Sequence, residues 1–479
     1  MIRVISGDND LSALEFQKHY RLPIVHLLDP SLIFGRKHNR DGWPFLMLAD
    51  QQGRIVFKKN SLVTREGQTI RKLLNNMLQE PPQVKPATLD GVAYMPATLQ
   101  RSGESRTPRK RERFSSLACG PDGKVYVVFT TNRNGNSDVF VRAFDGKTWS
   151  EDRPVAATAA DEYDGTVMID TQNQVWVSWT SNADGKNYNI FAATLANTLE
   201  PVKALQVTRA DDDAMHARMA CDQQGNVYLT YYKWHKMRQW SRDKEVYVRR
   251  WTVNKWSDEV RISPTDVPEY EDHSDPAIAG YDDGAIVCWS WDFHRPGGYT
   301  RQAAAATIFA RRIDSGLKLG KIIPVSGKQI DLTPALGGSD DKNIWCAWDS
   351  LGWDGKLHSY RKTLRISEVT SDVRNPGTEG IKLSEPVVNV CTPTFAVSPA
   401  GTITLLWSET KDGRNWVLKR AEFDSKENKW SKSKTIESKG NPRYCSAGYD
   451  STGELWVSYS VETDKGREIV AKKLQTKDD

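Results

Sequence analysis

From about residue 114 onward, the chain repeats one pattern of alternating apolar strands. Each copy has a turn containing Asp, Asn or Gly, followed by an apolar strand that ends on an aromatic residue. The copies occupy residues 121–129, 172–179, 224–231, 283–289, 342–348, 400–407 and 452–459, with a period of roughly 50 to 60 residues. One copy cannot bury its own apolar face, so the copies must stack around an axis. The pattern predicts a mainly β fold, a seven-bladed β-propeller over residues 114–479.

Charge and hydropathy exclude some classes of function. A formal net charge of +5 on 479 residues is small, so composition gives no case for a nucleic-acid partner. No apolar run reaches the roughly 18 residues that a membrane span needs. Polar residues, beginning with Arg3, interrupt the first residues from Met1 to Asp8 almost at once, so we expect no signal peptide in this chain.

The six cysteines give no cofactor motif. No Cys-x-x-Cys occurs, so neither a zinc knuckle nor a dithiol redox motif is present, and no nucleotide-binding motif is found either. Cys119 and Cys221 fall at the same place in different copies, which is too far apart for a disulfide in a ring of repeats. We therefore expect buried free thiols that act as small apolar side chains.

Residues 1–80 have a different pattern. A strand at Val4 and Ile5 precedes a short helix over 11–16, a strand-turn-strand over 43–58 and a helix over 70–78. This order resembles the second half of a thioredoxin-like or peroxiredoxin-like domain, with Pro44 at the place of that family's cis-proline. The family's nucleophilic cysteine lies on a first strand-helix unit that this chain lacks, since its first cysteine is Cys119. The resemblance implies a partial α/β module without dithiol chemistry, or a truncated N-terminus.

Residues 81–113 have the composition of a linker. They contain five prolines and a basic run over 101–113, which predicts a solvated tether, with a nucleic-acid patch as the alternative. The last copy ends near Leu474 after three strands, so a strand from this segment could complete it.

Four of the 8 histidines flank two of the predicted hairpins. His216 and His235 lie on either side of the turn at 224–225, and His273 and His294 on either side of the turn at 283–284. Residues equidistant from an antiparallel turn are neighbours in space. The spacing therefore predicts two histidine pairs on one face, near the mouth of the central channel.

The same face is expected to carry the longest loops, at 233–240, 292–301 and 349–358, and acidic connections at 211–213 and 269–275. Candidate ligand-binding residues in and beside these loops are Trp234, Trp240, Asp292, Trp353 and His358. Imidazoles, carboxylates, guanidinium groups and aromatic rings are the groups that a sugar site uses. No triad of metal ligands is fixed by the spacing, so no metal site is assigned, although a divalent ion remains open.

Two motifs carry a family resemblance over most of residues 114–474. The segment Asp275-Pro-Ala-Ile-Ala279 and the Lys-Trp-Ser segments ending at Ser150, Ser257 and Ser431 look like sialidase-like and TolB-like bacterial propellers, which are often periplasmic or secreted. Residues 144–149 are similar to the sialidase Asp-box, but they lack its leading Ser and the residue between Asp and Gly. The Phe-Arg-Ile-Pro motif of sialidases is absent.

Two functions follow from this pattern. The first is a propeller that binds a glycan or a protein through the histidine-bearing face. The second is a polysaccharide lyase or glycoside hydrolase, because the histidine placement is similar to that of propeller polysaccharide lyases. Its candidate catalytic residues are His216, His235, His273, His294, Tyr232, Arg238, Tyr299 and Arg295. In that function His235 or His294 acts as the base, and Tyr232 or Tyr299 acts as the acid. Arg238 or Arg295 binds the carboxylate of the substrate.

Overall fold

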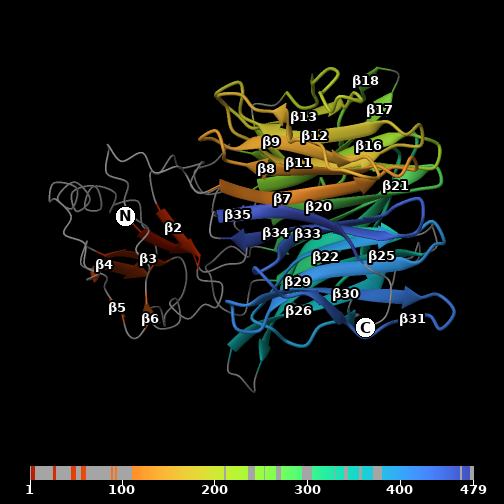
Figure 1. The fold of residues 1–479 in the computed structure, drawn as a ribbon. Helices are drawn as coiled ribbons and strands as arrows, with labels where there is room; N and C mark the ends of the chain where they lie inside the picture. The colour runs from red at the N-terminus through yellow and green to blue at the C-terminus, as the bar shows by residue number, and fades with distance from the viewer. Residues whose placement is uncertain are drawn as a thin grey trace. The chain divides into compact units, whose positions relative to one another are not determined.

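The structure is a computed structural model of the 479-residue chain, which divides into two compact units, Met1–Thr107 and Pro108–Asp479 (Figure 1). It describes residues 2–5, 25–28, 45–49, 55–60, 88–89, 92–93, 110–209, 212–235, 243–252, 254–265, 271–293, 305–327, 330–338, 343–354, 359–369, 380–463 and 466–474. All regular structure within these ranges is β, and none of the described residues is helical. No helix in the described part of the chain is long and apolar enough to cross a bilayer.

Among its described residues, the first unit contains three short strand pairs. β1 (Ile2–Ile5) pairs in parallel with β2 (Val25–Leu28), and β3 (Phe45–Ala49) pairs antiparallel with β4 (Ile55–Asn60), where the sequence predicts strand-turn-strand. β5 (Thr88–Leu89) pairs with β6 (Val92–Ala93). The two helices expected at 11–16 and 70–78, and Pro44, lie outside the described residues.

The second unit consists of consecutive antiparallel groups of strands. The first groups are β7 (Lys110–Cys119), β8 (Val125–Thr131), β9 (Asp138–Phe144) and β10 (Arg153–Ala156), then β11 (Glu162–Ile169), β12 (Val175–Ser181), β13 (Asn189–Thr194) and β14 (Leu205–Gln206). Next come β15 (Asp213–Cys221), β16 (Val227–His235), β17 (Asp243–Thr252), β18 (Lys255–Trp256) and β19 (Val260–Arg261), followed by β20 (Glu271–Tyr281), β21 (Gly284–Phe293), β22 (Ala305–Asp314) and β23 (Leu319–Pro324).

The remaining groups complete the second unit. They are β24 (Ile330–Gly338), β25 (Ile344–Asp354), β26 (Ser359–Glu368) and β27 (Ile381–Lys382), then β28 (Asn389–Val397), β29 (Ile403–Thr410), β30 (Trp416–Asp424), β31 (Lys429–Trp430) and β32 (Lys434–Glu437), and finally β33 (Arg443–Tyr449), β34 (Leu455–Thr463) and β35 (Gly466–Lys473). β35 also pairs in parallel with the start of β7, where Gly466 lies opposite Lys110.

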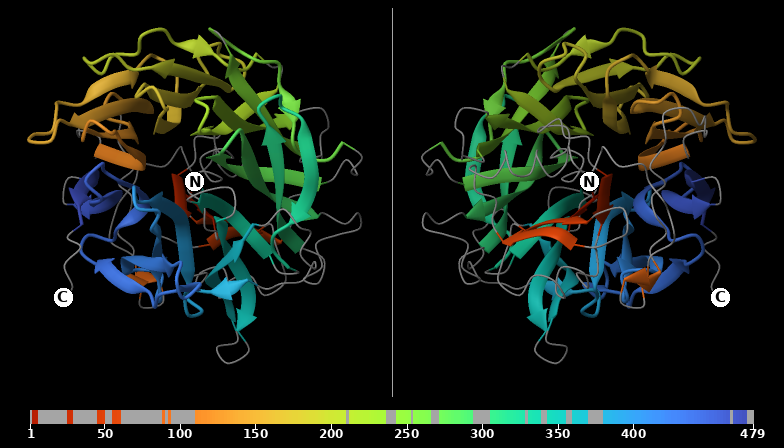
Figure 2. Two further views of the ribbon diagram at one scale, coloured as in Figure 1. Left: turned by 90° about the vertical axis from the view of Figure 1, so that its right-hand side faces the viewer. Right: turned by 90° about the vertical axis from the view of Figure 1, so that its left-hand side faces the viewer.

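The groups of this unit follow one another around a ring (Figure 2). The first strand of each group contacts the first strand of the next, in the order β7, β11, β15, β20, β24, β28 and β33, and β33 contacts β7. The first strands are therefore the inner strands of a closed cycle. The second strands are buried, and Trp289, Trp348 and Trp407 on three of them are fully enclosed.

In three of the hairpins, an aspartate closes the turn between the first and second strands. Asp170 Oδ1 accepts the backbone N–H groups of Gln172 (3.0 Å) and Gln174 (2.8 Å), while its Oδ2 accepts the indole N–H of Trp176 (2.8 Å). Asp222 and Asp450 close their turns in the same way. The turn therefore orients the aromatic side chain at the start of the second strand, which accounts for this part of the repeated sequence.

The Lys-Trp-Ser segments join neighbouring groups of strands. The ring of Trp430 lies 5.4 Å from that of Trp345 in the preceding group, and the two rings are nearly perpendicular. Trp149 contacts Trp456, and Trp256 contacts Trp176, in corresponding positions. Each segment thus inserts an aromatic side chain between two sheets, where it adds to the buried apolar area.

All six cysteines are free thiols. Burial raises the pKa of Cys119 to about 12 and that of Cys391 to about 11. These two thiols therefore stay protonated at neutral pH, and a protonated thiol is a poor nucleophile.

Candidate functional site

Every inner strand carries a β-bulge near its start, and one residue of each bulge has a positive φ. These residues, which we call the inner ring, are Phe114 (51°), Asp164 (54°), His216 (57°), Asp275 (52°), Thr333 (47°), Thr392 (47°) and Tyr444 (57°). The register shifts at the same place in each hairpin, as between Met215 and Arg218. A left-handed conformation is strained for residues with a side chain, at about 1–3 kcal/mol each. None of the seven positions is glycine, the residue that would relieve this strain.

Two pairs of consecutive inner-ring members contact each other across neighbouring sheets. His216 Nδ1 lies 3.6 Å from Asp164 Oδ2, and the rings of Phe114 and Tyr444 have centroids 4.8 Å apart. The bulges therefore bring side chains from different sheets together along the cycle of inner strands.

The most highly connected part of the ring centres on His216 of β15. Its imidazole stacks on Tyr232 of β16, with ring centroids 5.1 Å apart and planes 23° from parallel. Arg218, two residues later, places its Nη1 3.2 Å and 3.1 Å from the two carboxylate oxygens of Asp164 on β11. The structure thus brings together two of the predicted site residues, His216 and Tyr232, and adds Asp164 and Arg218. We call these four residues the His216 cluster.

The charged groups of the His216 cluster stabilise one another electrostatically. Burial alone would raise the pKa of Asp164, but the positive charge of Arg218 and the adjacent His216 imidazole hold it below its usual value. The Asp164 carboxylate is therefore ionised at neutral pH, although it is 4% exposed. It fixes a guanidinium group whose own side chain is 37% exposed. Arg218 is consequently the accessible end of a buried ion pair.

The side chains in and beside the His216 cluster differ in how far they are exposed to solvent. Tyr232 is 1% exposed and His216 6% exposed, so ligand access to both rings is restricted. Above the Tyr232 ring lies the ammonium group of Lys244 (4.9 Å), which is also 5.8 Å from the half-buried ring of Trp234. The accessible groups beside the cluster are therefore two cations and one aromatic face.

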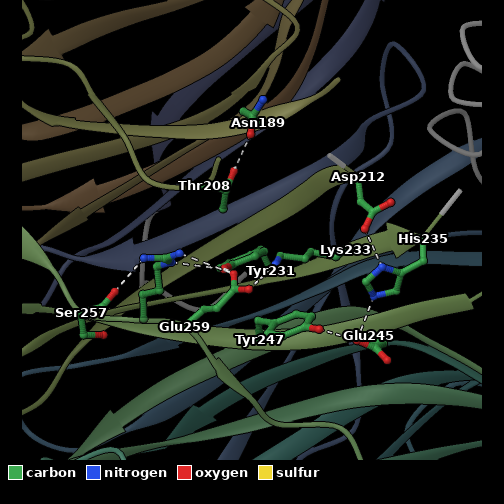
Figure 3. Close-up of polar contacts among 11 residues, drawn as sticks. Asn189, Thr208, Asp212, Tyr231, Lys233, His235, Glu245, Tyr247, Ser257 and Glu259 are labelled. Carbon is green, nitrogen blue, oxygen red and sulfur yellow. Dashed lines mark hydrogen bonds and ion pairs between the residues drawn. The ribbon is translucent and has the colours of Figure 1, made fainter. Parts of the chain in front are cut away.

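His235 lies in a second group of charges, at the end of β16 (Figure 3). Its Nδ1 is 2.6 Å from Asp212 Oδ2, and its Nε2 is 2.9 Å from Glu245 Oε2. Glu245 also binds Tyr247 and Arg261. The hydrogen bonds to Glu245 and Asp212 outweigh partial burial and raise the pKa of His235 to about 9. This imidazole is protonated at neutral pH, so it is a cation and not a base.

A neighbouring network covers the same strands, β16 and β17 (Figure 3). Glu259 accepts a hydrogen bond from the Tyr231 hydroxyl (2.7 Å), binds Lys233 and lies 3.5 Å from Arg249. Positive and negative side chains are therefore paired throughout this part of the sheet, which holds the strands beside the His216 cluster in a fixed register.

The predicted pairing of His216 with His235 is wrong. The register pairs Asp213 with Trp234 and Met215 with Tyr232, so His235 lies beside Asp212, not beside His216.

His273 is fully buried. Its Nδ1 accepts the indole N–H of Trp289 (3.0 Å), and its ring also contacts that of Trp291. Burial lowers its pKa to about 3, so it is neutral and has the environment of a core residue.

Of the ligand-binding candidates, Trp234 lies on β16 and Asp292 on β21, opposite Asp272. Trp353 lies on β25, opposite Tyr360, but its side chain is outside the described residues. His294, Arg238, Tyr299, Arg295, Trp240 and His358 also lie outside the described residues. Among the side chains that are described, no group of three or more His, Cys, Asp or Glu could hold a metal ion.

Sequence reasoning missed Asp164, Arg218, Lys244 and Glu245. Asp164 and Arg218 are 54 positions apart and meet only because their sheets are neighbours in the cycle. The sequence contained one signal for Arg218, which lies two residues after His216 in the same predicted strand.

No protein-family model matches this chain, and neither does any curated protein. Among solved structures, it is similar to a polysaccharide lyase described as a PL25 ulvan lyase, with 12% identity, a TM-score of 0.47, and 76% of this chain and 96% of that chain covered. It is also similar to a puromycin-hydrolysing peptidase of Mycobacterium tuberculosis, with 11% identity, a TM-score of 0.46 and coverage of 77% and 52%. The NanB sialidase of Streptococcus pneumoniae has 10% identity, a TM-score of 0.39 and coverage of 87% and 73%.

Proposed function

We propose that residues 114–479 form a seven-bladed, sialidase-like β-propeller that binds a glycan beside the His216 cluster. The closed cycle of inner strands supports the blade number, since seven first strands contact one another in turn within the described residues. We propose further that residues 1–80 are a partial thioredoxin-like module and residues 81–113 a linker. The observation that carries the binding function is an accessible guanidinium group, Arg218, fixed by a buried carboxylate, Asp164.

The chemistry of the accessible groups suits a polyhydroxylated ligand. A guanidinium group offers five N–H donors in a planar fork, which matches vicinal hydroxyls or a carboxylate. Trp234 offers an aromatic face, and Lys244 a further donor beside it. A few fixed polar groups next to an aromatic surface are typical of small-ligand sites. Because the side chains stand on rigid strands, little conformational entropy is lost on binding.

Binding is favoured over catalysis by the burial of the proton-transfer groups. A general base must come within about 2.6–3.2 Å of the proton it removes. His216 and Tyr232 are almost enclosed, and the protonated His235 cannot accept a proton at neutral pH. Recognition through Arg218, Lys244 and Trp234 needs no change in the buried groups.

A second candidate function is a lyase or hydrolase acting on an acidic polysaccharide. The observation that favours it is the placement of His216 between the Asp164 carboxylate and the Tyr232 ring. In that function His216 removes the proton, Tyr232 protonates the leaving group, and Arg218 binds the uronate carboxylate. This assignment differs from the sequence-based one, in which His235 or His294 is the base.

The test of binding uses the full chain and a panel of polysaccharides: xylan, mannan, alginate, polygalacturonate and ulvan. Arg218→Lys keeps a positive charge beside Asp164 but removes the planar fork, and we expect it to weaken binding about tenfold in calorimetry. Arg153→Lys, at an exposed position of β10, is the matched control and leaves affinity unchanged. The proposal fails when no polysaccharide binds the unaltered chain, or when Arg218→Lys binds as tightly as the control.

The test of catalysis uses the same panel. β-Elimination forms a conjugated double bond whose ultraviolet absorbance reports turnover. The enzyme function requires turnover by the unaltered chain and its loss in His216→Asn and Tyr232→Phe, with affinity and melting temperature retained. A chain that binds a uronate polymer but never produces this absorbance, or any reducing ends, is a binding protein.

A further inference from the structure

Among the described residues, the last group of strands lacks the outer strand that the other groups have. In the six preceding groups an outer strand pairs antiparallel with the third strand, and these outer strands are β10, β14, β19, β23, β27 and β32. In the last group β35 is the third strand, and its neighbours in the sheet are β34 and the start of β7. β7 covers only Gly466 and Arg467, in parallel. Residues 469–473, which we call the β35 edge, therefore have no outer strand within the described chain.

The outer strands of four groups share one pattern of hydrogen bonds. An apolar residue donates its N–H to a carbonyl of the third strand, and the Ser or Thr after it accepts the N–H of that same third-strand residue. In the third group, Ile262 donates to the carbonyl of Val246 (2.8 Å), and Ser263 Oγ accepts the N–H of Val246 (3.2 Å). The other three groups use Val207 with Thr208, Val325 with Ser326, and Leu383 with Ser384. An outer strand of this fold thus places Val, Ile or Leu opposite one fixed position of the third strand.

Ile469 is the residue of β35 at that fixed position. It lies opposite Ser460, just as Val246 lies opposite Tyr232, and Ser460 and Tyr232 both follow the aromatic residue near the end of their second strand. A buried carboxylate replaces the outer-strand hydroxyl here, since Glu112 Oε2 accepts the N–H of Ile469 (2.9 Å). The carbonyl of Ile469 accepts no hydrogen bond from the described residues.

Ala471 is the next position of β35 that points away from β34. Leu474 donates its N–H to the carbonyl of Leu455 at the start of β34 (2.7 Å). Residues of a paired strand alternate between bonding to that partner and pointing away from it, so the N–H and C=O of Ala471 point outward. Ala471 is half-buried, and its outward groups have no hydrogen-bond partner in the described part of the chain. Such backbone groups are a template for an added strand.

We propose that the β35 edge binds an extended segment of another polypeptide, which adds antiparallel to β35 as its outer strand. The other groups define the chemistry of this segment: Val, Ile or Leu lies opposite Ile469 and donates its N–H to the Ile469 carbonyl. Lys473 ends the edge with a side chain that is 46% exposed and 3.8 Å from Glu454, so acidic residues in the segment add to the attraction.

A second copy of β35 fits this edge poorly. Two copies paired antiparallel about Val470 would place Lys473 opposite Arg467, two like charges, and the small side chain of Ala471 opposite Ile469. The partner is therefore a different segment. The interaction lies on the outer part of the sheet and does not depend on the glycan binding proposed for the His216 cluster.

The first experiment measures hydrogen–deuterium exchange of the full chain alone, by mass spectrometry at single-residue resolution. We expect the amide of Ala471 to exchange about tenfold faster or more than that of Val470, whose N–H points at β34. Equal protection of the two amides would overturn the proposal, because this chain would then cover the edge itself. Light scattering would tell a second copy, which gives a dimer, from a strand supplied by residues 81–113 of the same chain.

The second experiment adds a synthetic peptide that copies residues 257–265, the outer strand of the third group, which contains Ile262 and the acidic residues Asp258 and Glu259. The control peptide carries Ile262→Asn. In the chain, Ala471→Pro removes the outward N–H without removing a hydrogen bond to β34, and Ala471→Val is the matched control that keeps this N–H. Affinity is measured by calorimetry, and melting temperature shows that each variant is folded.

We expect the peptide to slow exchange of the Ala471 amide about tenfold, and to bind Ala471→Pro about tenfold more weakly than Ala471→Val. The control peptide should bind the unaltered chain about tenfold more weakly than the original peptide. Unchanged exchange at Ala471 in the presence of the peptide, or equal binding by the two Ala471 variants, would refute the proposal. Should Ala471→Pro not fold, the comparison of the two peptides decides the outcome.

Discussion

The strain in the inner ring can be measured with one pair of substitutions on β28. Thr392 and Thr394 are both half-buried threonines of the same strand, but only Thr392 has a positive φ, 47°. We expect Thr392→Gly to leave the free energy of unfolding nearly unchanged, and Thr394→Gly to lower it. The same chemical change then has two outcomes, because glycine is unstrained at the first position and offers no such relief at the second.

The magnitudes follow from the backbone. A β-branched residue in the left-handed region costs about 1–2 kcal/mol, which Thr392→Gly recovers. Glycine costs about 1 kcal/mol through the greater freedom of the unfolded chain, and loss of half-buried side-chain contacts costs a similar amount. The sum for Thr392→Gly is near zero. Thr394→Gly has no strain to recover and also loses β-propensity worth about 1 kcal/mol, so it is destabilising by about 3 kcal/mol. Thr394 lies opposite Leu406 in the regular part of the hairpin.

Urea unfolding followed by circular dichroism measures both variants against the unaltered chain, with an unchanged slope as the check that only stability differs. Equal losses at the two positions would refute the reasoning, since they would mean that the Thr392 side chain stabilises the bulge by as much as its strain costs.

Three further outcomes test other parts of the structure. Glu245 and Asp212 raise the pKa of His235 from 6.5 to about 9, so the ion pairs of the protonated imidazole stabilise the fold fully below pH 6.5 and are lost as the pH rises through about 9. The free energy of unfolding should therefore fall by about 3 kcal/mol over that interval. The His235→Gln variant should not show this fall. Lys362 and Asp349 form a buried pair at 2.5 Å, so Lys362→Met should cost about 3–5 kcal/mol in urea unfolding, and adding Asp349→Leu should restore at least half. Trp430→Ala should cost about 2–3 kcal/mol in the same assay by removing an aromatic contact between two sheets.

The parts of the fold that depend on local chemistry were predictable. The apolar runs at 172–179 and 452–459 are strands, β12 and β34, because alternation and an Asp-closed turn act within a few residues. The mainly β class followed from the same pattern. The Lys-Trp-Ser segments were visible as a repeat, but their role required the neighbouring sheet, since Trp430 contacts a residue 85 positions earlier, Trp345.

The bulges could not be read from the sequence. A left-handed position is usually marked by glycine, and the inner ring has none, so no local signal reported the extra residue in each inner strand. The predicted pairing of His216 with His235 failed for another reason, because it placed the centre of the turn too far along the chain. The register beside the turn, Cys221 with Val227, already leads to Tyr232 as the partner of His216, and the bulge shifts this register by one residue. In the structure His216 lies beside Asp164, and His235 pairs with Asp212.

This outcome bears on how a repeat fold acquires a ligand site. Each inner strand repeats one backbone geometry, and the side chain placed there differs from strand to strand, from Phe114 through His216 to Tyr444. Glycine at these positions removes the strain but also loses side-chain contacts and adds freedom to the unfolded chain, so stability alone selects no single residue there. The seven side chains have in common only their place along the inner strands. We therefore expect substitutions that exchange ring residues between inner strands to change the binding that we propose for this face, while leaving the fold intact.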